Sequence, residues 1–164
     1  MPEQKTLERA SKAKRAGKSP STQAGAFVKE QIDHIREGKH GAKSAKQAIA
    51  IGLSEARRSG VKMKAPKKGT TSEATRRKAA QDTKASHRTK KSPSTESKAK
   101  RSAASTRALK RESTKAASPK ALSRQSHAAS SRRSAADRSA AAKKGWATRR
   151  ANAAKGSRTR HASR

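Results

Sequence analysis

Hydrophobic residues larger than alanine occur at only 14 of the 164 positions, and 11 of these lie before residue 65. Between Pro20 and Glu37 the apolar residues recur every three or four positions and trace one helical face, at Ala24, Phe27, Val28, Ile32 and Ile35. Ser19 followed by Pro20 is typical of a helix start, and Gly38 of a helix end. The pattern predicts a helix over about residues 20–37.

A second apolar face follows after a short linker. Its residues are again spaced for a helix, at Ala45, Ala48, Ile49, Leu53 and Ala56. Ser44 with Gln47 three residues later is a capping-box pattern, and Arg57, Arg58 and Gly60 are typical of a helix end. The sequence therefore predicts a helix over about residues 45–59, joined to the first as a helical hairpin.

Two features of this region leave alternatives open. Gly52 lies in the middle of the second helix at a cost of about 1 kcal/mol relative to Ala, and either a close helix crossing or simple tolerance would explain it. Residues 3–16 have a weak helical face formed by Leu7, Ala10 and Ala13, which predicts a third, mostly polar helix.

The rest of the chain has a different composition. Residues 65–164 contain three large apolar residues and a net charge of +24, against +9 for residues 1–64, and the change falls at the Ala65–Gly69 segment. Low hydrophobicity with high net charge predicts disorder. The expected fold is a small all-α module (1–64) followed by a largely disordered Lys/Arg/Ala/Ser-rich tail (65–164). We expect helix within the tail at about 99–117 and 134–154 when a partner neutralises the cations.

The module has few side chains with which to offset the entropy of ordering its backbone. We therefore expect the module to be marginally stable, with partner binding or self-association supplying the rest of the free energy needed for folding.

Several functional classes are excluded by what the sequence lacks. It has no cysteine for disulfides, no apolar run near the ~20 residues of a membrane span, and no secretory h-region. It also has no nucleophile elbow, zincin motif or phosphate-binding loop. We expect a cytoplasmic, non-enzymatic protein without cofactor, metal or small-molecule substrate, whose five histidines are solvated.

The net charge predicts the kind of partner that the protein binds. The chain has 44 Lys and Arg against 11 Asp and Glu, a net charge of +33 and a pI near 11.9, which predicts a polyanionic partner. A membrane surface is less favoured because the tail has no large apolar face. Basic residues almost without aromatics suit contact with the sugar–phosphate backbone.

The candidate nucleic-acid-binding residues fall in two groups. In the module they flank the second helix, whose N-terminus at Ser44 offers a seat for a phosphate, and they are Lys39, His40, Lys43, Lys46, Arg57 and Arg58. A solvated basic loop is the alternative there. In the tail they are Lys67, Lys68, Arg76, Arg77, Lys78, Lys90, Lys91, Lys98, Lys100, Arg101, Lys110, Arg111, Arg132, Arg133, Lys143, Lys144, Trp146, Arg149 and Arg150. Trp146 is the one tail aromatic that could contact a base, or else a small local apolar anchor.

Residues 19–61 resemble a short domain of unknown function found in small basic bacterial proteins, some of them labelled DNA-binding. The likeness rests on the segments SPSTQAG, HIREGKHGAKS and KQAIAIGLSEARR, and it implies a bacterial source. The tail is similar in composition to linker-histone and bacterial histone-H1-like tails, with one SPK element at 118–120.

Together these features predict a sequence-tolerant DNA-binding protein of the bacterial nucleoid that acts by phosphate neutralisation and compacts DNA. An RNA- or ribosome-associated binder is one alternative, because phosphate neutralisation does not distinguish the two polymers. The other is a helical protein-interaction module with a localising basic tail.

Overall fold

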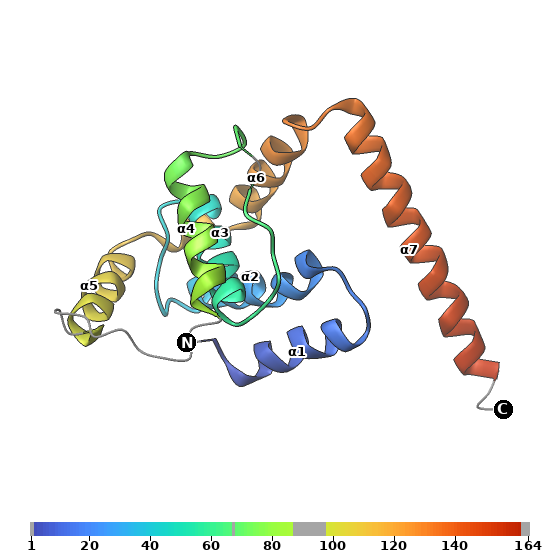
Figure 1. Cartoon of the computed structure of the whole chain (residues 1–164), viewed down its shortest axis with the longest axis horizontal. Coiled ribbons are helices and arrows are strands. Elements are labelled where there is room, and N and C mark those ends of the chain that lie inside the picture. The colour runs from blue at the N-terminus through green and yellow to red at the C-terminus, as the bar shows by residue number, and fades with distance from the viewer. Residues whose placement is uncertain (1, 67, 87–97, 162–164) are drawn as a thin grey trace. The chain divides into compact units, whose positions relative to one another are not determined.

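The computed structural model describes residues 2–66, 68–86 and 98–161, with side chains except at 98, 99, 101, 102 and 154–161. All regular elements in these ranges are helical (Figure 1), which confirms the all-α class: α1 (Gln4–Arg15), α2 (Pro20–Arg36), α3 (Ala45–Arg58), α4 (Glu73–Ala85), α5 (Lys98–Lys110), the short 3-10 helix η1 (Thr114–Ala117), α6 (Pro119–Ser131) and α7 (Ala135–His161). Contacts divide the chain into an N-terminal unit, Met1–Leu122, and a C-terminal unit, Ser123–Arg164.

The starts of α2 and α3 are fixed by the predicted caps. The Ser19 hydroxyl accepts a hydrogen bond from the Thr22 backbone N–H at 3.4 Å, and Pro20 follows as the first helical residue. The Ser44 hydroxyl accepts from the Gln47 N–H at 3.2 Å. The Gln47 side chain accepts in return from the Lys43 N–H at 2.8 Å, one residue earlier than in the usual capping box.

The first apolar cluster lies among α1, α2 and α3. Phe27 is fully buried at its centre, with Ala10, Ala24, Ala56 and Val61 buried around it. Leu7 of α1, which belongs to the weak apolar face expected for residues 3–16, packs against this cluster. The predicted N-terminal helix therefore contributes to the core even though most of its surface is polar.

A second cluster joins the α2–α3 linker to a distant segment of the chain. Ile35, Ala42 and Ala48 pack with Ala116 and Ala117 of η1. The backbone supports this contact, because the Gly41 N–H donates to the Leu109 carbonyl at 2.9 Å and the Ala42 N–H to the Ser113 carbonyl at 3.2 Å. A β-carbon on residue 41 would lie 1.9 Å from the Glu112 carbonyl oxygen, so this approach requires glycine.

Helix α4 packs on α3 through a buried carboxylate. Asp82 is 3% exposed and accepts a hydrogen bond from the Ser54 hydroxyl of α3. Its carboxylate also lies 3.7 Å from Arg58 Nε and 3.6 Å from Lys78 Nζ. Residues beyond 64 therefore add α4 and η1 to the N-terminal unit, whereas the composition grouped them with the tail.

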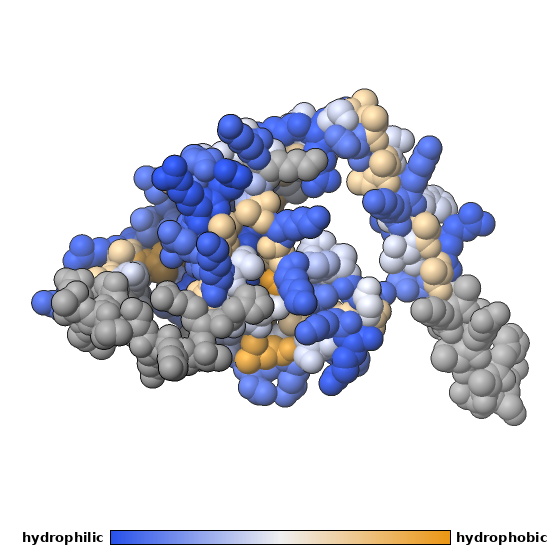
Figure 2. Space-filling model, viewed as in Figure 1, coloured by the Kyte–Doolittle hydropathy of each residue, from blue (hydrophilic) through white to orange (hydrophobic). Residues whose placement is uncertain are grey.

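The helices beyond residue 64 agree only in part with the positions expected from the sequence. Helices α5 and α7 begin within one residue of the two segments expected to be helical, while α4 and α6 lie where no helix was expected. Every side chain described in α7 is exposed, including Trp146 at 66%. On the face shown in Figure 2, hydrophilic residues cover most of the described surface. In the described ranges, no helix combines the length and apolar character needed to cross a membrane.

Candidate functional sites

The basic residues around the linker between α2 and α3 differ in their surroundings. Lys43 and Lys46 are exposed beside the N-terminus of α3. Lys39 instead forms ion pairs with Glu37 at 2.9 Å and Glu3 at 3.5 Å, which raise its pKa. His40 is partly buried, and its Nδ1 lies 3.0 Å from the Gly41 carbonyl oxygen.

The two arginines at the end of α3 differ in their surroundings. Arg57 is 7% exposed, its Nη1 donates to the Leu53 carbonyl at 3.5 Å, and its Nε has no hydrogen-bond partner. Arg58 is exposed, but it bonds to the Ser54 hydroxyl at 3.0 Å and pairs with Asp82. Arg58, and not the buried Arg57, is therefore the arginine that solvent reaches at this end of α3.

The cations of α4 have acidic partners on their own helix. Arg76 donates two hydrogen bonds of 3.0 Å to Glu73, Arg77 lies 3.7 Å from the same carboxylate, and Lys78 pairs with Asp82. Arg76, as the strongest partner, lowers the pKa of Glu73. These pairs leave α4 much less free cationic charge than its sequence indicates.

The other candidate residues before the C-terminal unit differ in how far they are described. Lys68, Lys100, Lys110 and Arg111 are exposed. For Lys98 and Arg101 only the backbone in α5 is described. Lys67, Lys90 and Lys91 lie outside the described residues.

Charge is distributed very differently in the C-terminal unit. Residues 123–164 have 12 Lys and Arg but a single acidic residue, Asp137. The Asp137 carboxylate accepts from the Ser134 hydroxyl at 2.8 Å at the start of α7. All ion pairs among the described residues lie between residues 3 and 82. The exposed cations described here, including Arg132, Arg133 and Lys144, therefore have no acidic partner.

One side of α7 combines cations with the tryptophan. With about 100° of rotation per residue, four of the basic residues whose side chains are described in α7 lie within about 80° of Trp146 around the helix axis, and they are Arg138, Lys143, Arg149 and Arg150. Asp137 lies on the opposite side. The helix therefore presents a cationic face centred on an exposed aromatic ring, which we call the Trp146 face.

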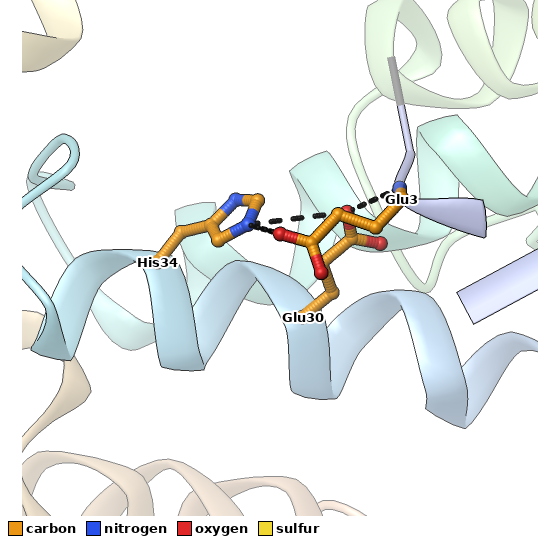
Figure 3. A group of neighbouring side chains, drawn as sticks. All are labelled: Glu3, Glu30 and His34. Atoms are coloured by element: carbon orange, nitrogen blue, oxygen red, sulfur yellow. Dashed lines mark hydrogen bonds and ion pairs between the residues drawn. The ribbon is translucent and has the colours of Figure 1, made fainter. Parts of the chain in front are cut away.

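A second candidate site lies where the N-terminus meets α2 (Figure 3). His34 Nε2 is 2.9 Å from Glu3 Oε1 and 4.0 Å from Glu30 Oε1. The Glu3 backbone N–H donates to Glu30 Oε1 at 2.8 Å. The hydrogen bond from His34 is the main cause that lowers the pKa of Glu3.

The carboxylate of Glu30 also affects Glu55 on α3. Burial raises the pKa of Glu55, and the negative charge of Glu30 raises it further. A hydrogen bond of 2.8 Å from the Gln31 side chain to Glu55 acts in the opposite direction. Burial and the negative charge of Glu30 together outweigh this hydrogen bond, so the pKa of Glu55 is raised.

The group formed by Glu3, Glu30 and His34 contains no paired-histidine metal motif, so the sequence motifs did not predict it. A local signal was present, since Glu30 and His34 are four residues apart and share a helical face. Nothing in the sequence indicated that Glu3, 27 residues before Glu30, would complete the group.

Comparison with known proteins agrees with the resemblance in the module. Residues 11–69 match the model of a family of unknown function (DUF6496). The match spans α2, α3 and the last five residues of α1, which confirms a short domain of unknown function in this region. No curated protein matches the chain, and no solved structure does so either.

Proposed function

We propose that this protein is a non-enzymatic, sequence-tolerant DNA-binding protein that acts by neutralising phosphates. The observation that carries the proposal is the Trp146 face of α7, where exposed cations without acidic partners surround an aromatic ring. Lys and Arg on an exposed surface bind phosphates and release condensed counterions. Two exposed cations at the N-terminus of α3 add a second contact, and they are Lys43 in the preceding linker and Lys46 in the first turn.

Backbone contact suits this composition better than base reading does. The described cations are distributed along helices, and the tail has one aromatic residue, whereas single-strand binders stack successive bases on several aromatic rings. A protein of this kind coats or bridges duplexes with little regard to sequence. We extend the proposal to compaction of DNA in the bacterial nucleoid.

The salt dependence of binding tests the mechanism. Fluorescence anisotropy of a labelled DNA duplex, titrated with the full chain at several salt concentrations, gives the slope of log K against log[salt]. If about eight phosphates are neutralised, the slope is near −7. A slope shallower than about −2 would refute the polyelectrolyte mechanism.

A matched pair of variants tests the location. Replacing Arg138, Lys143, Arg149 and Arg150 by Gln should make the slope shallower by about 3 to 4. The control replaces four cations that already have acidic partners, namely Lys29, Arg76, Arg77 and Lys78. It removes the same formal charge and should change the slope by about 1 or less. Equal effects would show that the Trp146 face has no special role.

Competition separates DNA from RNA. With a labelled duplex bound at fixed salt, unlabelled duplex DNA should displace it at lower concentration than structured RNA of equal length. If the RNA competes better, the phosphate-binding mechanism stands and the partner is RNA.

A further inference from the structure

The group Glu3, Glu30 and His34 has the composition of a metal site. Two carboxylates and one imidazole each offer a ligand atom, and these atoms lie within 4.8 Å of one another. They line a pocket of about 210 Å³. The same pocket is bordered by the acidic residues Asp33 and Glu37 and by the basic residues Lys5, Arg9 and Lys29. Four of the 11 acidic residues of a strongly basic chain therefore meet here.

The carboxylate of Glu30 is the buried member of this group, and one of its two oxygens has no hydrogen-bond partner. The Glu30 side chain is 3% exposed. Its Oε1 accepts the Glu3 N–H, but its buried Oε2 has no hydrogen-bond partner. Burying a charged oxygen without a partner is costly, and a cation in contact with the carboxylate would offset that cost.

From these observations we infer that Glu3, Glu30 and His34 bind a divalent transition-metal ion, with zinc as the fitting probe. Ligand atoms at about 2.1 Å from a tetrahedral ion are about 3.4 Å apart. The two distances from His34 Nε2, 2.9 Å and 4.0 Å, bracket this value. Small side-chain movements would therefore suffice, and the buried Glu30 provides a fixed ligand.

The surroundings leave room for such an ion. Glu3 is half-exposed and His34 is 17% exposed, so a water molecule can reach the open position of a three-ligand site. Lys39 approaches Glu3 at 3.5 Å, but it has a closer partner in Glu37 at 2.9 Å. Binding of a metal would replace the contact between Glu3 and Lys39 and leave the pair with Glu37 intact.

Isothermal titration calorimetry of the untagged full chain with zinc chloride, after nuclease and chelator treatment, tests the site. We expect one saturable zinc ion per chain. The variants Glu3→Gln, Glu30→Gln and His34→Gln should each weaken binding by at least about tenfold. Cobalt(II) titrated in place of zinc should give visible absorption that the same variants abolish.

Two controls keep the test specific. Glu8→Gln and His127→Gln remove an exposed carboxylate and an exposed imidazole elsewhere and should bind zinc as the wild type does. If Glu30→Gln unfolds the unit, as followed by circular dichroism, the half-exposed Glu3 still provides a variant in a folded chain. The inference is wrong if no saturable site is found, or if the control variants weaken binding as much as the ligand variants.

Discussion

Gly52 of α3 lies against the backbone of Val28 in α2. A β-carbon on residue 52 would lie 2.7 Å from Val28 Cα and 2.8 Å from its backbone nitrogen. Of the two explanations that the sequence allowed for this glycine, the structure supports the close helix crossing. The missing side chain is what lets the two helices approach each other.

Replacing Gly52 with Ala should therefore destabilise the N-terminal unit. The clash is with backbone, which cannot move aside cheaply, so overpacking should cost about 1–3 kcal/mol. Gly25→Ala is the matched control, since that glycine is also inside a helix, α2, but has nothing within 4 Å of its β-carbon position. It should stabilise the helix by about 0.5–1 kcal/mol. Urea unfolding followed by circular dichroism measures both, and shifts of the same sign would contradict the crossing.

Asp82 should control whether α4 stays attached to α3. Asp82→Ala leaves the Ser54 hydroxyl without its acceptor and removes the ion pairs to Arg58 and Lys78. Loss of these buried contacts should cost about 1–3 kcal/mol. Hydrogen exchange should show faster exchange in α4 (Glu73–Ala85), with α2 and α3 still protected.

The control for this prediction is Asp33→Asn, which breaks the exposed ion pair with Lys29. It should change stability by about 0.5 kcal/mol or less. If exchange in α4 is the same in the wild type and in Asp82→Ala, the carboxylate does not hold the helix.

Glu55 should make the N-terminal unit less stable as the pH rises. Its pKa in the folded chain is raised by burial and by Glu30, so the folded state binds the proton more tightly than the unfolded state does. This contribution is present at acidic pH and is lost as the pH rises through the raised pKa.

Glu55→Gln should therefore be slightly more stable than the wild type at pH 7, and the difference should fade toward pH 4. The amide can still accept the hydrogen bond from Gln31. Thermal melts at a series of pH values check the sign. Glu3 provides the opposite case, because His34 lowers its pKa, and the stability from that contact is lost as the pH falls. A variant at residue 55 that is less stable at neutral pH would refute the assignment.

Trp146 should report directly on binding by the C-terminal unit. The chain has one tryptophan and no tyrosine, and the ring is 66% exposed, so free protein should show the red-shifted emission of a solvated indole. If the ring stacks on a base, duplex DNA should quench the emission. Trp146→Ala should then weaken binding by roughly 1–3 kcal/mol. An unchanged spectrum at saturating DNA would favour the local apolar anchor.

The local features of the module could be predicted from the sequence, but its long-range contacts could not. Ser19 and Ser44 act as the predicted caps, since capping depends on neighbours within three or four residues. The contacts of Ala116 and Ala117 with Ile35 were missed, because alanines in a basic, low-complexity segment give no hydrophobic signal. The candidate site residues were predictable only in part for the same reason. The sequence shows that Arg76 is a cation, but the composition of the tail did not indicate that Glu73 pairs with it in the folded chain.

The packing of η1 against Ile35 and Ala42 determines how the protein can be shortened. A truncation that ends at residue 64 removes Ala116 and Ala117 from the second cluster and uncovers an isoleucine that is fully buried in the whole chain. It also removes the Leu109 and Ser113 carbonyl groups that accept hydrogen bonds from the Gly41 and Ala42 amides. Fragments intended to fold independently should therefore extend to Leu122, where the N-terminal unit ends.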